Sequence, residues 1–135
     1  YRTHRTERIR MATLRDRELA NLRAVFDHAP IPLFRVDDEG AVLAANHAFC
    51  EFVAMKLERV VGTYIGLTGL DQVFPYVGVR LVEAARKGDA EPLVHTATYV
   101  SGERGPITVK VTLAPERNEE GRVTHFTGTV HPLGY

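Results

Sequence analysis

A short stretch in the first third of the chain decides the fold. It reads Asp37-Asp38-Glu39-Gly40-Ala41-Val42-Leu43-Ala44-Ala45-Asn46. Carboxylate side chains hydrogen-bond nearby backbone groups and glycine adopts a positive φ at little steric cost, so residues 37–40 predict a tight turn. The apolar runs on either side, 33–36 and 41–43, predict two strands joined as a hairpin. Asn46 breaks the second strand and can cap a helix over residues 47–53.

The composition indicates one globular domain with an additional element. The chain has 135 residues, of which 44% are hydrophobic and 25% charged. A single cysteine, Cys50, excludes an internal disulfide and is typical of a reducing compartment, so we expect a cytoplasmic protein. No apolar run approaches the ~18 residues of a membrane span, and we expect no membrane partner. The chain lacks an initial methionine and starts inside a helical pattern, which we interpret as a piece of a longer protein.

Charge is distributed unevenly along the chain. Residues 1–23 hold seven arginines against three acids, and the remainder carries four more acids than bases. A basic segment on an acidic body can bind nucleic acid or anionic lipid, or can be a solvated helical linker. Acids, threonine and leucine interrupt the arginines, and no set of aromatic side chains on which bases could stack accompanies them. We therefore interpret the segment as a linker and expect no nucleic-acid partner.

The first 27 residues predict an amphipathic linker helix. Residues 5–27 contain neither Gly nor Pro and are rich in good helix formers. Apolar side chains recur at spacings of three or seven and share one stripe, at Ile9, Ala12, Leu19 and Leu22. A lone helix must bury such a stripe against something. We therefore expect a homodimer interface through these residues, with the last turns packed on the body.

The rest of the chain predicts short helices followed by a β-meander. Helices are expected over 56–61 and 74–87, an irregular segment over 63–73, and strands over 92–100, 107–113 and 122–131. Pro132 lacks the N–H that a sheet ladder uses, so we expect a tail over 132–135. The fold class is α+β: a five-stranded antiparallel sheet covered on one face by short helices, with the N-terminal amphipathic helix added.

Five pieces of sequence, in this order and spacing, resemble a PAS domain: residues 26–34, 37–40, 44–49, 57–62 and 118–123. The likeness runs from about Leu22 to Val130, and we place the sensor domain at 28–131. The resemblance implies a signalling module of a bacterial-type regulator, for two-component or cyclic-nucleotide signalling. It also implies dimerisation, a covalently linked effector domain outside this sequence, and a cavity between sheet and helices that holds a small molecule.

Large apolar side chains are candidates for the wall of that cavity, at Phe34, Phe49, Phe52, Phe74 and Leu81. His95 and Tyr99 share one face of the strand over 92–100 with Ala97, and would bring polar groups into the cavity if that face points inward. The opposite register, with Val94, Thr96 and Thr98 inward, stays open, because a slip of one residue exchanges the two faces.

No residue constellation predicts catalysis or a metal site. His47 and Cys50 lie three apart on one predicted helix and could touch, but no third member accompanies them, so we interpret them as a helix-start histidine and a buried thiol. The flavin-binding PAS branch carries an Asn-Cys-Arg-Phe motif later in the chain than Cys50. The haem branch has a histidine on the long helix, where 74–87 has none. The cofactor is therefore unassigned. A ligand-free interaction module and a haem or flavin sensor, with His95 as the first axial-ligand candidate, remain alternatives.

Overall fold

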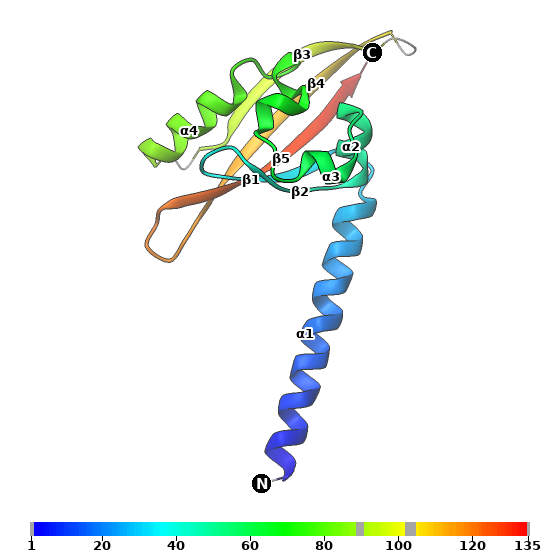
Figure 1. Ribbon diagram of the computed structural model, residues 1–135, viewed down its shortest axis with the longest axis vertical. Coiled ribbons are helices and arrows are strands. Elements are labelled where there is room, and N and C mark those ends of the chain that lie inside the picture. Colours follow the sequence, from blue (N-terminus) through cyan, green and yellow to red (C-terminus); the bar gives the residue numbers. More distant parts are fainter. Residues whose placement is uncertain (1, 89–90, 102–104, 135) are drawn as a thin grey trace.

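The computed structural model describes residues 2–88, 91–101 and 105–134, with side chains from Thr13 onward in these ranges except at 101 and 134 (Figure 1). The elements in chain order are α1 (Arg2–His28), β1 (Leu33–Asp37), β2 (Val42–Ala45), α2 (His47–Val53), α3 (Leu57–Val60), the 3₁₀ turns η1 (Ile65–Thr68) and η2 (Leu70–Gln72), α4 (Val77–Lys87), β3 (Leu93–Ser101), β4 (Gly105–Arg117) and β5 (Val123–Gly134).

The five strands form one antiparallel sheet in the order β2-β1-β5-β4-β3. The early hairpin joins the late meander because β1 pairs with β5 over its whole length. In Figure 1, the helices after α1 gather over one side of this sheet. The predicted α+β class, with a five-stranded sheet covered on one face, is confirmed.

The predicted turn and helix cap form as the side-chain chemistry dictates. The Asp37 carboxylate accepts hydrogen bonds from the N–H groups of Glu39 and Ala41, both at 2.9 Å, and Gly40 adopts φ +90°. Asn46 caps α2 by accepting from the N–H of Phe49 at 2.9 Å. The chain therefore passes from hairpin to helix within a few residues, as the sequence predicts.

The core lies between the sheet and its helices. On β1, Phe34 and Val36 are fully buried while Leu33, Arg35 and Asp37 are half-buried, which is the period-2 alternation of a sheet with one covered face. Phe34 lies directly over Gly128 of β5, where a Cβ atom would approach its ring to 2.1 Å. Only glycine fits there, so the centre of the sheet is filled by the Phe34 ring.

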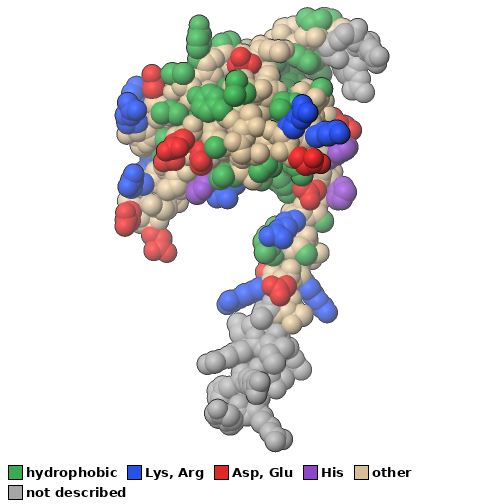
Figure 2. Space-filling model, viewed as in Figure 1, with side chains coloured by type: hydrophobic (Ala, Val, Ile, Leu, Met, Phe, Trp, Pro, Cys, Tyr) green, Lys and Arg blue, Asp and Glu red, His purple; other side chains and the backbone are tan. Residues whose placement is uncertain are grey.

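Helix α1 projects away from the body and contacts it through α2 near its C-terminal end (Figures 1 and 2). Leu19 and Leu22 are 49% and 62% exposed. Ile9 and Ala12 lie outside the residues whose side chains are described. Leu14 and Val25 are also exposed, so the apolar side chains of α1 extend beyond the predicted stripe. Among the described residues, no helix is long and apolar enough to cross a bilayer.

Several elements differ from the sequence expectation, and the largest difference is in strand β4, which runs over Gly105–Arg117 and not only over 107–113. Helix α4 begins at Val77 rather than Phe74, since Tyr76 takes φ +58°, which stops a helix from extending back through it. The segment expected to be irregular contains η1 and η2. Strand β5 continues past His131 to Gly134, with Pro132 opposite Val109. A proline is accommodated in a ladder where its missing N–H would have pointed away from the neighbouring strand.

Candidate functional site

The inner face of β3 carries polar side chains at the border of the core. His95, Ala97 and Tyr99 are half-buried, whereas Val94 and Val100 on the opposite face are 45% and 70% exposed. The structure thus distinguishes the two registers that the sequence left open, and His95 and Tyr99 face the helices. Four residues of strand separate them by about 13 Å, with the small Ala97 side chain between.

Each of these two polar side chains packs against an aromatic ring from the helical layer. The Tyr99 ring centroid lies 5.3 Å from that of Phe52 on α2, and the His95 ring lies 5.1 Å from that of Phe74. The Arg80 guanidinium covers the Phe74 ring at 4.8 Å from its centroid. The rings are tilted by 45° in the Tyr99–Phe52 pair and by 34° in the His95–Phe74 pair, which is an ordinary geometry for favourable aromatic contacts.

The seven predicted site residues divide into two groups. Phe34, Phe49, Phe74 and Leu81 are fully buried in the core, and the first two pack together with ring centroids 4.7 Å apart. Phe52, His95 and Tyr99 are half-buried at its β3 side. The structure therefore brings residues distant in sequence together as aromatic pairs, and places the polar members of the set at one end of the core.

The polar atoms of His95 and Tyr99 are not satisfied by the protein. Within the described part of the chain, neither side chain forms a hydrogen bond, although both are half-buried. Among the described residues, no buried side-chain nitrogen or oxygen lacks a hydrogen-bond partner, so solvent reaches the polar atoms of His95 and Tyr99 and these atoms are free to bind water or a ligand. This arrangement can orient a small molecule with one polar group near each end.

Surface hollows lie elsewhere, and sequence reasoning did not find them. A hollow of about 790 Å³ lies where α1 meets α2, and its lining includes His28, Asn46, Cys50, Met55 and Leu57. Two smaller ones, of about 440 and 420 Å³, lie beside the C-terminal end of α4 and beside its N-terminal end. None of these three hollows is lined by any of the seven predicted site residues.

The pair singled out on α2 does not form a Cys–His contact. The His47 imidazole pairs with the Glu51 carboxylate, with Nε2 2.8 Å from Oε1, on the exposed surface of α2. Burial raises the pKa of the Cys50 thiol, which disfavours the nucleophilic thiolate. In the described part of the chain, no three His, Cys, Asp or Glu side chains are placed to hold a metal ion.

Asn46 does more than cap a helix. It is fully buried, and its Oδ1 accepts from the N–H groups of both Leu33 and Phe49, while its Nδ2 donates to the Ile31 carbonyl, each at 2.9 Å. Its side chain therefore ties the linker after α1 to the start of α2. The capping role was readable from sequence, but the bonds to Ile31 and Leu33 depend on the folded path of the linker.

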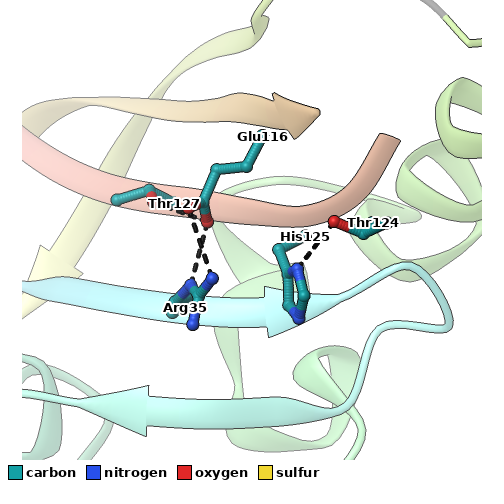
Figure 3. A network of polar contacts seen from close by, with 5 residues as sticks. All are labelled: Arg35, Glu116, Thr124, His125 and Thr127. Carbon is teal, nitrogen blue, oxygen red and sulfur yellow. Dashed lines mark hydrogen bonds and ion pairs between the residues drawn. The ribbon is translucent and has the colours of Figure 1, made fainter. Parts of the chain in front are cut away.

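The uncovered face of the sheet holds a polar network (Figure 3). The Arg35 guanidinium donates two hydrogen bonds to the Glu116 carboxylate, at 2.9 and 3.3 Å, and the Thr127 hydroxyl donates a third at 3.1 Å. The hydrogen bond from Arg35 lowers the pKa of Glu116, partial burial opposes this shift, and the charge of Arg35 reinforces it. The network joins β1, β5 and β4 across the exposed side of the sheet.

The fold and the sequence together assign the chain to a family. The family model described as the PAS fold matches residues 20–133. The chain belongs to the PAS family. The predicted resemblance is confirmed, and PAS domains are sensory modules of signalling proteins. No curated protein matches the chain in sequence.

Solved PAS domains share the architecture at low sequence identity. The PAS domain of BvgS from Bordetella pertussis superposes with a TM-score of 0.68 at 18% identity, covering 87% of this chain and 88% of that one. The PAS domain of an HTR-like protein from Haloarcula marismortui gives 0.65 at 18% identity, covering 92% and 98%. A domain of a sensory box sensor histidine kinase/response regulator from Geobacter sulfurreducens gives 0.57 at 23% identity, covering 84% and 93%. At these identities the likeness demonstrates the fold alone.

Proposed function

We propose that this PAS domain binds a small molecule between the inner face of β3 and the helical layer, and that occupancy changes the arrangement of a homodimer formed through α1. The observation that carries the proposal is the pair of half-buried polar side chains, His95 and Tyr99, which have no hydrogen-bond partner in the described part of the chain. A ligand with an aromatic body and polar groups at its two ends suits this pair and the rings of Phe52 and Phe74.

Binding at this position would reach α1 through α2. Phe52 lies on α2 in contact with Tyr99, and α2 is the element that α1 contacts. A ligand entering between the two rings must displace Phe52 and thereby bias the position of α2. Such a molecule transmits a signal only if it binds two arrangements of the proposed homodimer with different affinities.

The dimer part of the proposal rests on the exposed side chains of α1. Leu19 and Leu22 lie on a helix that projects from the body, and pairing with a second copy would bury them. An effector domain elsewhere in a full-length protein would receive the change. Sedimentation of the variant Leu19→Glu/Leu22→Glu should show a smaller assembly than the wild type, whereas Leu67→Glu, at an exposed leucine of η1, should keep the wild-type mass. Equal masses for the two variants would contradict a dimer through α1.

The ligand site is tested with purified protein and a set of planar heteroaromatic compounds, by native mass spectrometry and thermal shift. Compounds that raise the melting temperature of the wild type should lose at least part of that shift in Tyr99→Phe, which removes one hydroxyl. Tyr76→Phe removes the same group from a tyrosine that is 77% exposed, and should keep the full shift. Identical shifts in all three proteins would place binding away from Tyr99.

A second candidate is a PAS module with a packed, ligand-free interior. The observation in its favour is that Phe34, Phe49, Phe74 and Leu81 are fully buried, and that the Phe34 ring fills the space over Gly128. A preparation that retains no small molecule and binds none of the added compounds would favour this alternative.

A further inference from the structure

The two edges of the sheet are treated very differently. Strand β2 is short, and its open side is covered, since the Val42 N–H donates to the Thr63 carbonyl and the Gly62 N–H donates to the Val42 carbonyl. Strand β3 forms the other edge and runs over nine residues, Leu93–Ser101. Within the described residues, no backbone group outside β4 hydrogen-bonds to β3.

Strand β3 also lacks the features that usually protect an edge. Its sequence, LVHTATYVS, contains no Lys, Arg, Asp, Glu or Pro. Its pairing with β4 has no bulge, whereas the β1–β2 and β4–β5 pairings both contain register shifts. A long, regular and uncharged edge strand is a template for pairing with another strand.

The prolines of the meander identify the backbone groups at the open edge. Pro106 lies opposite Val100 of β3. Because proline has no backbone N–H, it costs the ladder no hydrogen bond only where the two opposite residues exchange none, so Pro106 and Val100 form a pair without hydrogen bonds. Because the two kinds of pair alternate along an antiparallel ladder, the even-numbered residues of β3 direct their N–H and C=O groups away from β4. Pro132 of β5 leads to the same assignment. It lies opposite Val109 of β4 in a pair without hydrogen bonds, so Val109 directs its N–H and C=O groups toward Ala97 of β3.

We propose that β3 is an interface between two copies of this chain, paired antiparallel about Ala97. The argument for a second copy is that the strand is complementary to itself. The one antiparallel register that overlaps all nine residues places Val94 opposite Val100 and Thr96 opposite Thr98 of the second copy. In this register the outward-directed backbone groups of both strands meet, and the β-branched pairs are ones that stabilise sheets.

This pairing makes a continuous sheet from two domains and is separate from the proposed α1 interface. It places His95 of one copy beside Tyr99 of the other, so the proposed ligand site borders the interface. If α1 also pairs, each chain has two different two-fold interfaces, and the assembly grows beyond a dimer. The two interfaces can therefore be separated by measuring mass in variants of each.

Cross-linking tests the register directly, in a Cys50→Ala background that removes the native thiol. At a pair without hydrogen bonds, the two Cα atoms are about 4.5 Å apart. That spacing is within the range of a disulfide, so Ala97→Cys should form a cross-linked dimer under mild oxidation. Val94→Cys is the matched control on the same strand, because in this register the two copies of residue 94 are about 20 Å apart. Cross-linking of both variants, or of neither, refutes the proposed pairing.

Charge at the edge supplies the second test. Thr96→Lys/Thr98→Lys places cations opposite one another across the two-fold axis at exposed positions, which should abolish association through β3 in sedimentation. Gln72→Lys/Leu67→Lys adds the same charge at exposed positions of η1 and η2 and should leave the mass unchanged. An unchanged mass in the β3 variant, with a circular dichroism spectrum like that of the wild type, overturns the proposal.

Discussion

Replacing the fully buried Asn46 by alanine should destabilise the domain more than the loss of a helix cap alone would. The substitution removes the acceptor for the N–H groups of Leu33 and Phe49 and the donor to the Ile31 carbonyl. Loss of a helix N-cap costs about 1 kcal/mol, and each buried group left without a partner costs about 1–3 kcal/mol. Because water can reach part of this site through the adjacent hollow, we expect a total of about 3–5 kcal/mol.

Asn118→Ala is the matched control. The Asn118 side chain also accepts hydrogen bonds from two backbone N–H groups, those of Glu120 and Arg122, but in an exposed turn where water replaces it. We expect a cost of about 0.5–1 kcal/mol there. The chain has no tryptophan, so urea unfolding is followed by far-UV circular dichroism. A difference between the two variants of less than about 1 kcal/mol would refute the assignment of Asn46 as a buried connection between the linker and α2.

Three further predictions concern other parts of the domain. Gly128→Ala places a methyl group against the Phe34 ring and should cost about 1–3 kcal/mol in the same urea assay. Gly66→Ala should be nearly neutral, because its Cβ would lie 3.4 Å from the nearest atom, on the Tyr64 ring. Equal effects of the two variants would contradict the close packing at Gly128. The pKa of Glu116 is lower in the folded state, so its ion pair stabilises the fold at pH values above the pKa of an unfolded glutamate, about 4.3, and this contribution is lost as the pH falls through the folded pKa. Glu116→Gln should therefore reduce the loss of stability between about pH 5 and 3. An unchanged pH profile of stability would argue against the network. Burial raises the pKa of Cys50, so iodoacetamide near about pH 8 should modify the native protein more slowly than the urea-unfolded chain, and equal rates would show an unperturbed thiol.

Local chemistry made much of the fold predictable from sequence. The turn at Asp37 and Gly40 forms because short-range hydrogen bonds and a positive φ require those residue types, and Asn46 caps α2 because its side chain reaches an N–H three residues away. The hydrophobic alternation of β4 predicts a strand with one covered face, and the structure buries Val109, Val111 and Leu113 on that face.

Long-range packing decided the rest. The register of β3 was undecided in sequence, since its two faces carry similar mixtures of apolar and polar side chains, and it is fixed in the structure by the pairing of Ala97 with Val109 on β4. The contact between Arg35 and Glu116 joins residues 81 positions apart, and no local pattern predicts it. The start of α4 depends on the positive φ of Tyr76, a residue type that rarely adopts one.

The sequence by itself therefore determined the order of elements, the family and the residue types available for a site. The tertiary structure alone decided which of those residues meet. It placed His95 and Tyr99 toward the helices, and left β3 as an open edge while covering β2. The physical reason is that turns and caps depend on interactions over a few residues. Strand register and sheet order depend instead on burying side chains from the whole chain in one core.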